Sequence, residues 1–382
     1  MFEAKLIELS NAGARAVRLR RMGGLSILTM QRAVTSTEAN YEDYLLSSRL
    51  PAPAYNDSSV AEYRKFYTPE RINGLHSGGN ENFIRDRREL RPFALRNQDR
   101  IKIFRPIVSP EVILSWNNVR ALIELGVHSN YDVIIIPDSF SQGDSEYAKI
   151  VLKARKYCED EISRVGLGNI EAVPSAGVYN DLELFKAKVK FAAKEGFPLL
   201  NIDNRYYPSH YPQYSFLKDF SAKAENICIY GSNVPRLHRA NWRTSGIHLY
   251  SAFGQDILSQ EIRPSFLPEG KRNVHDDPKR KFRLFDPNED ALIKRGEYNT
   301  KYGEELIYND NPYCTGETLT SMYNKHNNQL LAKVLKVIEF MESTKTLSSE
   351  RNAVITNEYQ EIMRNKGEIG RFIAKLGQRT LF

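Results

Sequence analysis

Cysteine is scarce in this sequence, and long apolar runs are absent. Only three cysteines occur among 382 residues, and they stand far apart, at Cys158, Cys228 and Cys314. Three dispersed cysteines exclude a disulfide framework and a zinc site built from four cysteines of this chain. No segment approaches the roughly 18 apolar residues that cross a membrane, and the first residues lack the apolar core of a secretory signal. We therefore expect a cytoplasmic protein that has no membrane partner.

The composition is that of a folded protein with a mild excess of basic residues. Hydrophobic residues make up 41% and charged residues 26% of the chain, which is enough to bury a core. Lysine and arginine number 54 against 47 aspartate and glutamate residues, so the net charge is +7. This excess fits a nucleic acid or another polyanion as partner, but many basic proteins bind neither, and both interpretations stay open. The length suits one large α/β domain or two smaller ones.

Short apolar runs alternate with helical patterns across residues 132–253. The apolar runs predict buried strands, and they lie at 132–137, 170–173, 197–202, 227–230 and 247–250. Alternation of this kind indicates parallel strands joined by right-handed crossovers, in an open doubly wound sheet or a closed barrel. Because no Gly-x-Gly-x-x-Gly follows a strand, a dinucleotide-binding fold is disfavoured. We predict an α/β fold, and within it a (β/α)8 TIM-like barrel.

The two ends of the chain differ from this middle part. Residues 16–21 and 25–29 flank Gly23–Gly24 and predict an N-terminal β-hairpin. Helical spacing of apolar residues returns near the C-terminus. We therefore predict a barrel over residues 1–315 with inserted loops at 35–100 and 265–300, followed by a C-terminal helical region at 316–382.

Reactive groups of such barrels sit where strands end and loops begin, at the carboxyl ends of the strands. The residues that follow the predicted strands are Asp138, Ser175, Asp203, Gly231, and Ser251 or Asp256. Two carboxylates at neighbouring strand ends would share a pocket, where their surroundings can separate them into a nucleophile and an acid/base. The alternative interpretation is that Asp138 caps the following helix and Asp203 begins a turn.

Two glycine-containing loops and one Cys/His pair are weaker candidates. The backbone N–H groups of Gly231 and Ser232 could face a phosphate or a base, although an ordinary tight turn explains the same residues. His76 heads a Gly-Gly loop, which lets the backbone approach a ligand or simply turns at the surface. Cys314 and His326 amount to two ligands, which are too few for a structural zinc site, so no bound metal is expected.

Basic residues gather in two segments that could follow a phosphate backbone. Arg236, Arg239 and Arg243 are spaced so that they lie on one side of a predicted helix at 235–244. Aromatic residues interleave with the basic ones and could stack on bases. Solvated surface charge together with packed aromatic residues is the alternative interpretation. The second basic segment contains Lys271, Arg272, Lys279, Arg280 and Lys281.

The order of several short motifs resembles the tRNA-guanine transglycosylase superfamily. The segment LHSGGN at 75–80 is similar to the family's Asp-Ser-Gly-Gly-Phe loop, and VPSAGVYNDL at 173–182 to its Val-Gln-Gly-Gly-x-Tyr-x-Asp-Leu stretch. The strand-end Asp138 resembles the aspartate that recognises a guanine-like base. IYGSNVP at 229–235 is similar to the family's Leu-Phe-Gly-x-Gly-x-Pro, and His326-Asn327-Asn328 resembles the motif near its zinc site.

The resemblance implies a base exchange in a nucleic acid. In that family a carboxylate attacks the anomeric carbon of a guanosine, guanine leaves, and a 7-deazaguanine replaces it on the covalent intermediate. A barrel pocket suits this chemistry, because an oxocarbenium-like centre needs a nearby carboxylate and an extruded base needs a flat slot. By analogy with the paralogues that act on DNA, DNA is preferred over tRNA as the polymer. Dimers are usual in the family, so a homodimer or a heteromeric partner is expected.

Several family positions are altered here, which leaves the nucleophile open. His76 stands where the family has an aspartate, Ser175 where it has a base-reading glutamine, and Ser251 where it has the nucleophile. Asp203 and Asp256 are the carboxylates that could take over the attack on the sugar. The family's cysteine cluster is missing, so the resemblance implies no zinc.

Three functions remain open at this point. The first is a guanine transglycosylase that acts on DNA or tRNA. The second is a catalytically silent homologue that binds nucleic acid or an active partner subunit, which the altered positions His76 and Ser251 favour. The third is an unrelated barrel enzyme that acts on a small glycosyl or phosphorylated substrate.

Overall fold

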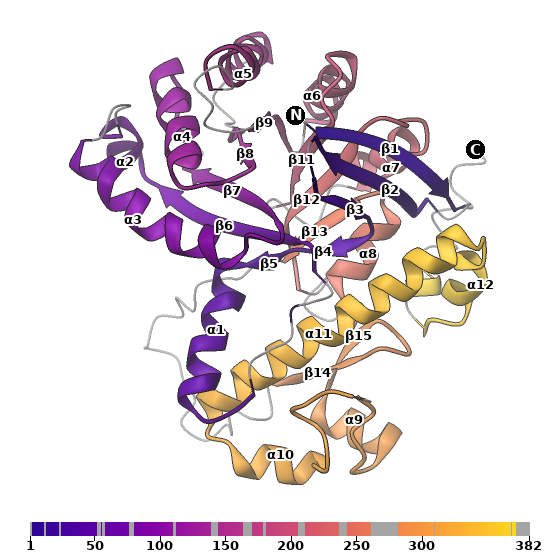
Figure 1. The fold of residues 1–382 in the computed structure, drawn as a ribbon. Coiled ribbons are helices and arrows are strands. Elements are labelled where there is room, and N and C mark those ends of the chain that lie inside the picture. Colours follow the sequence, from indigo (N-terminus) through magenta and orange to yellow (C-terminus); the bar gives the residue numbers. More distant parts are fainter. Residues whose placement is uncertain are drawn as a thin grey trace.

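The computed structural model describes most of the 382-residue chain. The residues that it does not describe are 1, 11–12, 23, 52–54, 56–57, 76–79, 110–111, 139–143, 163–169, 179–180, 205–210, 237–242, 261–281, 309, 368 and 372–382. The described part is a mixed α/β structure in which two five-stranded sheets are flanked by helices (Figure 1). The α/β class predicted from the alternating apolar runs is therefore confirmed.

All neighbouring strands of the first sheet are parallel. Its order is β5–β6–β7–β8–β9, formed by Val34–Thr35, Val60–Tyr67, Ile101–Val108, Val133–Ile135 and Glu171–Val173. Parallel neighbours need a crossover connection between them, which is usually helical. The connections contain α1 (Ser36–Ser47), α2 (Pro69–Asn73), α3 (Glu81–Arg96), α4 (Trp116–His128), and α5 (Asp144–Tyr157) with the π-helical turn Cys158–Ile162.

The second sheet is also parallel throughout. Its order is β10–β11–β12–β13–β4, formed by Ser175–Gly177, Leu199–Asp203, Cys228–Val234, Ile257–Gln260 and Gln31–Arg32. Asp181 caps the first connecting helix as predicted, since its Oδ1 accepts a hydrogen bond of 3.0 Å from the amide of Leu184. The connecting helices are α6 (Leu182–Lys194), α7 (Tyr211–Ser221) and α8 (Gly246–Ala252).

The two sheets are joined at both edges by single residues. Ala33 alone separates β4 from β5, and Pro174 alone separates β9 from β10. Both residues continue the hydrogen bonding between neighbouring strands. The amide of Ala33 donates to the carbonyl of Leu258 over 2.9 Å, and the carbonyl of Pro174 accepts from the amide of Asn201 over 2.9 Å. Residues 31–35 and residues 171–177 therefore each contribute one strand to each of the two sheets.

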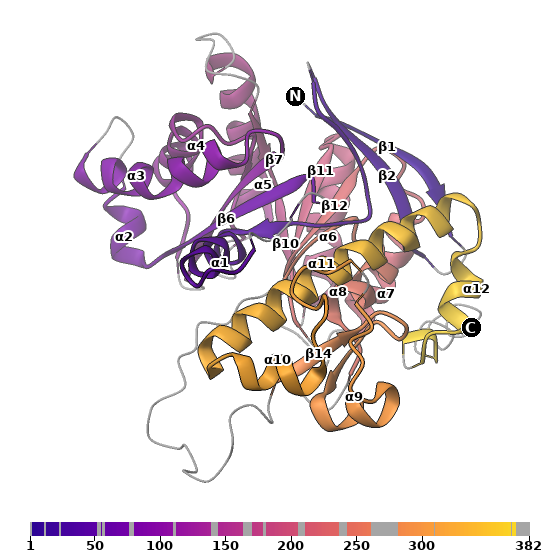
Figure 2. The same ribbon diagram turned by 60° about the horizontal axis from the view of Figure 1, so that its bottom comes forward.

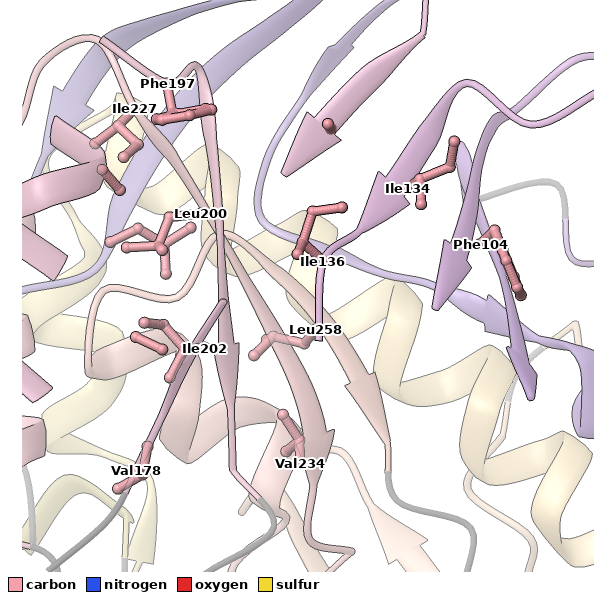
Figure 3. Close-up of a cluster of buried hydrophobic side chains, with 14 of the residues drawn as sticks. Phe104, Ile134, Ile136, Val178, Phe197, Leu200, Ile202, Ile227, Val234 and Leu258 are labelled. Atoms are coloured by element: carbon pink, nitrogen blue, oxygen red, sulfur yellow. The ribbon is translucent and has the colours of Figure 1, made fainter. Parts of the chain in front are cut away.

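Side chains along the strands alternate between two buried clusters, because successive residues of a strand point to opposite faces. On β8, Val133 and Ile135 belong to a cluster called here the inner cluster, which collects side chains from strands of both sheets. Ile134 and Ile136 belong to the outer cluster, which also contains side chains of the connecting helices. Figure 3 shows outer-cluster side chains on several strands. Each face of the sheets is therefore packed, as in parallel sheets generally.

An N-terminal antiparallel sheet covers the amino ends of the parallel strands. It consists of β1 (Phe2–Leu9), β2 (Arg15–Arg21) and β3 (Ser26–Leu28), which confirms the predicted hairpin. Val17 and Leu19 of β2 pack in the inner cluster. Arg15 donates to the carbonyl of Ile227, which directly precedes β12, so the hairpin is fastened to the start of a strand.

Two parts of the chain differ from the predicted pattern. Residues 247–250, predicted as a strand, lie in helix α8, and the strand beside β12 is β13 at Ile257–Gln260. All residues of α8 are buried, and an apolar run without periodicity does not distinguish a buried helix from a strand. Residues 35–100, predicted as an inserted loop, contain α1, β6 and α3. Charged residues on β6 and on the exposed side of α3 concealed these elements.

The C-terminal region is helical, as predicted, and one long helix holds it against the sheets. A hairpin of β14 (Arg283–Asp286) and β15 (Ala291–Lys294) precedes α9 (Arg295–Tyr302) within the predicted insertion at 265–300, whose residues 265–281 lie outside the described part. Helix α11 (Asn328–Ile355) passes alongside α8 and β14 (Figure 2). Among the described helices, none is both long and apolar enough to cross a membrane. The last helices are α10 (Leu319–Lys325), α11 (Asn328–Ile355) and α12 (Tyr359–Arg364).

Candidate functional site

The face of the strands that carries the inner cluster changes from apolar to polar toward the carboxyl ends of the strands. On β7, Ile101 and Ile103 belong to the inner cluster, and two residues further along the same face stands Arg105. On β11, Leu199 belongs to the inner cluster, and Asn201 and Asp203 follow it on that face. The carboxyl end is also where reactive groups of parallel α/β folds are found. The polar part of the inner face is therefore the candidate site.

Glu62 on β6 is the centre of a buried ionic cluster, called here the Glu62 network. Its carboxylate accepts hydrogen bonds from Arg105 Nε and from the hydroxyl of Ser259, and from Arg64 Nε over 2.7 Å. Burial alone would raise the pKa of Glu62, but the guanidinium groups of Arg105 and Arg64 outweigh it and lower the pKa to about 2. Glu62 is therefore ionised at neutral pH, and it fixes the positions of both arginines.

The Glu62 network continues to Asp203 through one asparagine. Arg105 Nη2 donates to Asn233 Oδ1 over 3.0 Å, and Asn233 Nδ2 donates to Asp203 Oδ1 over 2.7 Å. Asn233 has a left-handed backbone with φ of 52°, and the pairing of β12 with β13 shifts register between Gly231 and Val234. Such an irregularity changes the direction of a side chain. Here the Asn233 amide contacts Arg105 of the first sheet and Asp203 of the second. The carboxylate of Asp203 is thereby oriented at the end of β11.

Asp138 lies at the same edge but is bound differently. Its Oδ1 accepts a hydrogen bond of 2.6 Å from Lys188 Nζ on α6, and its Oδ2 accepts one of 2.9 Å from the amide of Gly177. Gly177 is the register partner of Asp203, so the two aspartates flank one residue of β10. The structure thus brings together the two strand-end carboxylates that the sequence singled out.

Ser175 faces the same part of the sheets. Its hydroxyl accepts a hydrogen bond of 2.9 Å from Asn201 Nδ2. Among the described residues, neither Asn201 Oδ1 nor the hydroxyl of Tyr230 has a hydrogen-bond partner, although both atoms are buried. Buried polar atoms normally have partners, and a bound ligand or ordered water would satisfy these two.

Gly231 and Ser232 serve packing rather than the site. A Cβ atom at Gly231 would come within 1.8 Å of Gln255 Oε1, so the glycine is needed for close approach to that side chain. The Ser232 hydroxyl is buried and lies 3.4 Å from the carbonyl oxygen of Ile202. Both residues lie within β12, where they pair with Ile202 and Asp203 of β11, so neither a tight turn nor a phosphate-binding loop is present at this position.

Asp256 stands at the opposite end of the strands from Asp203. It directly precedes β13, where Arg15 Nε lies 3.0 Å from its Oδ1 and the amide of Ile229 donates to its Oδ2 over 2.6 Å. Burial raises its pKa to about 6 against the opposing effect of Arg15. The residue follows a helix and begins a strand, so it is not among the side chains gathered at the carboxyl end.

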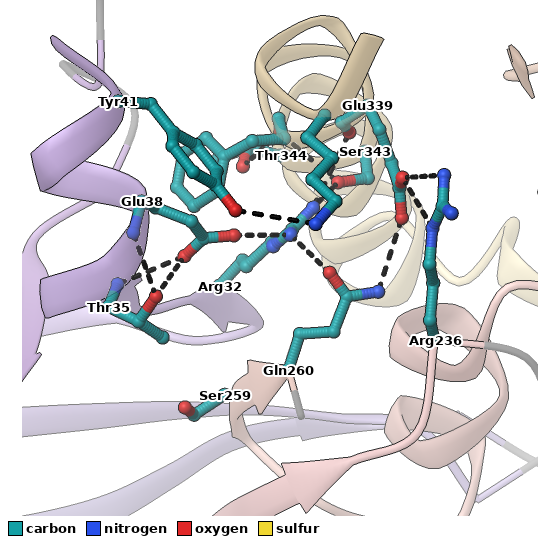
Figure 4. Close-up of polar contacts among 12 residues, drawn as sticks. Arg32, Thr35, Glu38, Tyr41, Arg236, Ser259, Gln260, Glu339, Ser343 and Thr344 are labelled. Carbon is teal, nitrogen blue, oxygen red and sulfur yellow. Dashed lines mark hydrogen bonds and ion pairs between the residues drawn. The ribbon is translucent and has the colours of Figure 1, made fainter. Parts of the chain in front are cut away.

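Two of the predicted nucleic-acid-binding residues form ion pairs within the chain, and the others lie outside the described residues. Arg236 pairs with Glu339 of α11, with Nη2 2.6 Å from Oε2, and Glu339 also accepts from Gln260 (Figure 4). Arg32 completes this cluster through Gln260 Oε1 at 2.6 Å, and so joins the strands to α11. Arg243 pairs with Glu297. The candidate site residues that lie outside the described part of the chain are His76, Arg239, Lys271, Arg272, Lys279, Arg280 and Lys281.

The Cys/His pair is not assembled into a recognisable site in the described part of the chain. Cys314 is buried in a C-terminal apolar cluster, which raises the pKa of its thiol to about 12. His326 is the C-cap residue of α10.

The sequence interpretation missed the Glu62 network. A period of two would have placed its charged members on the face of the apolar cluster, because Val60, Glu62 and Arg64 share one face of β6, as do Ile103 and Arg105 on β7. The contacts between these residues could not be predicted in this way. When charged residues follow apolar ones on the same face of a strand, the pattern indicates a polar site at that end of the strand.

No family model and no curated protein matches the sequence. Among solved structures, the carboxyl transferase domain of Rhizobium etli pyruvate carboxylase, determined with 3-bromopyruvate, aligns over 92% of this chain with 10% sequence identity and a TM-score of 0.35. The chain spans about half of that structure's length, 53%.

Proposed function

We propose that the two sheets form one closed (β/α)8 barrel, with the candidate site at its carboxyl mouth. Counting β4–β5 and β9–β10 as one strand each gives eight strands, and every one of them pairs with two neighbours. The contact between Arg105 of one sheet and Asn233 of the other supports this arrangement, because it crosses the space that a barrel would enclose. In such a barrel the inner cluster would be the packed interior.

We further propose that the protein is a base-exchange transglycosylase of nucleic acids. The observation that carries this proposal is the oriented carboxylate of Asp203, held by Asn233 at the end of a strand. Asp203 attacks the anomeric carbon while the glycosidic C–N bond breaks, and that electron pair leaves with guanine, which takes up a proton. A 7-deazaguanine that has lost its ring N–H proton then forms the new C–N bond and releases the carboxylate.

The other polar groups at this edge suit the binding of a base and a sugar. Asn201 and Tyr230 supply the hydrogen-bonding atoms that read the edge of an extruded base, and Ser175 orients Asn201. At the same edge, hydrogen bonds from Lys188 and from the amide of Gly177 hold the carboxylate of Asp138 in place. DNA is the preferred polymer over tRNA, on the resemblance stated above, and a 7-deazaguanine is the incoming base.

The experiment supplies the protein with DNA or tRNA and an isotope-labelled 7-deazaguanine, and measures labelled nucleosides by mass spectrometry. We expect label in DNA with the wild-type chain. The variant Asp203→Asn keeps the shape of the side chain but removes the nucleophile, and should lower the rate by at least about 1,000-fold. Asp219→Asn, an exposed acid on α7, is the matched control and should retain the full rate.

Two results would overturn this proposal. The first is a wild-type chain that transfers label to neither polymer under conditions in which it remains folded. The second is an Asp203→Asn variant that transfers label as fast as the wild type, because the carboxylate would then have no part in the reaction.

A catalytically silent nucleic-acid-binding homologue is the second candidate. The observation in its favour is that Glu62 and Asp138 both carry cationic partners within the protein, as structural carboxylates do. In that case Asp203→Asn and the wild type would bind DNA equally, with the same salt dependence, and neither would exchange bases.

A further inference from the structure

A second buried cluster of polar side chains lies between the helices at the C-terminal side of the sheets. His248 comes from α8, Asp290 from the turn between β14 and β15, Glu350 from α11, and Lys366 follows α12. His248, Asp290 and Glu350 are the described group of metal-ligating side chains whose ligand atoms lie within 4.8 Å of one another. All three residues are almost completely buried.

The distances within this group are close to those of a tetrahedral metal site. His248 Nδ1 lies 3.1 Å from Glu350 Oε2 and 3.7 Å from Asp290 Oδ1. Zinc binds nitrogen and oxygen ligands at about 2.0–2.1 Å in a tetrahedron, which puts neighbouring ligand atoms about 3.3 Å apart. An imidazole and two carboxylates are ligands that zinc accepts. Shifts of a few tenths of an ångström would bring the three atoms into its coordination sphere.

Lys366 places an ammonium group against the two carboxylates of this cluster. Its Nζ lies 2.6 Å from Asp290 Oδ1 and 3.1 Å from Glu350 Oε1. One ammonium faces two carboxylates, so a dication would balance the buried charge more completely. Two polar atoms of the cluster, His248 Nε2 and Asp290 Oδ2, are buried without a hydrogen-bond partner among the described residues.

A cavity beside the cluster gives Lys366 a place to move. This cavity has a volume of about 490 Å³ and is lined by residues of α11, the segment around α12 and the turn after β14. Glu350 and Lys366 both line it, and the Lys366 side chain is 9% exposed. The ammonium can therefore swing into solvent through a change of rotamer, and water can enter from the same side.

We propose that His248, Asp290 and Glu350 form a binding site for a divalent transition metal of the Zn²⁺ class, for which the ammonium of Lys366 competes. Water from the cavity supplies the fourth ligand. The site joins α8, α11 and the β14–β15 turn, so a bound metal fastens the C-terminal helices to the second sheet. This inference does not depend on the proposed base exchange.

The test titrates the full-length, tag-free and chelator-treated chain with ZnCl₂ in a calorimeter. We expect one Zn²⁺ per wild-type chain. Lys366→Met removes the competing ammonium and should tighten binding at least tenfold. Glu350→Gln removes one anionic ligand and should weaken binding at least tenfold, whereas Glu361→Gln, an exposed acid on α12, should bind as the wild type does. Co²⁺ in place of Zn²⁺ should give a tetrahedral absorption spectrum in the wild type.

The proposal is overturned if Lys366→Met binds Zn²⁺ no more tightly than the wild type, or if Glu350→Gln binds it equally well. Should either variant not fold, the wild-type chain decides the question. One Co²⁺ per chain with a tetrahedral spectrum supports the site, and an octahedral spectrum or no binding rejects it. Base exchange can be assayed on the same samples, so failure of the metal site and failure of the proposed activity are separate results.

Discussion

The amino and carboxyl ends of the parallel strands differ in chemistry although the same strands form both. At the amino ends, Ile101, Leu199 and their neighbours make an apolar cluster that the N-terminal hairpin covers. At the carboxyl ends, the same face carries Arg105 and Asp203 in a continuous chain of hydrogen bonds. Position along a strand therefore decides whether a residue of this face packs among apolar side chains or joins a buried network of charges.

The largest loss of stability should come from the substitution Glu62→Gln at the carboxyl ends of the strands. The substitution leaves the buried guanidinium of Arg105 without its counter-charge and weakens the hold on Arg64. Breaking a buried ion pair from one side costs about 3–5 kcal/mol of unfolding free energy. Urea denaturation monitored by circular dichroism measures this loss. Glu305→Gln, at an exposed acid, is the control and should leave the midpoint unchanged.

A second substitution separates charge from packing in the Glu62 network. In the double variant Glu62→Gln, Arg105→Met, both charged partners are gone, so much of the stability lost in Glu62→Gln should return. A double variant that is less stable than Glu62→Gln would show that Arg105 is held mainly by other contacts, such as its bond to Asn233.

A small substitution among the apolar residues at the amino ends of the strands should lower the stability much less. Ile103→Val removes one methylene from the inner cluster, where Ile103 is fully buried. The expected cost is about 0.5–1.5 kcal/mol, because the transfer free energy of one methylene is lost and a small cavity remains. The same urea titration measures it, and base exchange by the folded protein should be unaffected. A loss of activity at unchanged stability would contradict the division between the two ends.

The two ends should also show opposite dependences of stability on pH. The pKa of Glu62 is lowered from 4.5 to about 2, so its contribution is present above pH 4.5 and is lost as the pH falls toward 2. The pKa of Asp256 is raised from 3.8 to about 6, so its contribution is present below pH 3.8 and is lost as the pH rises through 6. The difference in unfolding free energy between wild type and Glu62→Gln should therefore grow with pH, and that between wild type and Asp256→Asn should shrink. Equal slopes for both variants would reject this assignment.

The middle strands and the two neighbouring aspartates could be predicted from the sequence. The apolar runs at 132–137, 197–202 and 227–230 correspond to β8, β11 and β12, because strands buried on both faces are apolar throughout. Asp138 and Asp203 were found because each directly follows such a run. The carboxyl ends of neighbouring parallel strands then bring them to one edge.

The rest depended on contacts between distant segments. Strand β13 is short and begins with only two apolar residues, Ile257 and Leu258. The longer apolar run before it forms the buried helix α8, so local hydrophobicity favoured the wrong segment. Glu62 stands in a strand whose charges suggested a solvated loop, and its partner Ser259 is 197 residues away. His248 and Glu350 are 102 residues apart, and no local spacing connects them.

The attachment of the N-terminal hairpin has a consequence for the order in which the protein is made. Arg15 binds the carbonyl of Ser221, 206 residues later, and the carboxylate of Asp256, 241 residues later. The hairpin leaves the ribosome long before these partners exist, so a segment that is synthesised before them must wait for them to dock. During that interval Val17 and Leu19 are open to other chains, and a chaperone that shields this hairpin would protect the nascent protein from aggregation.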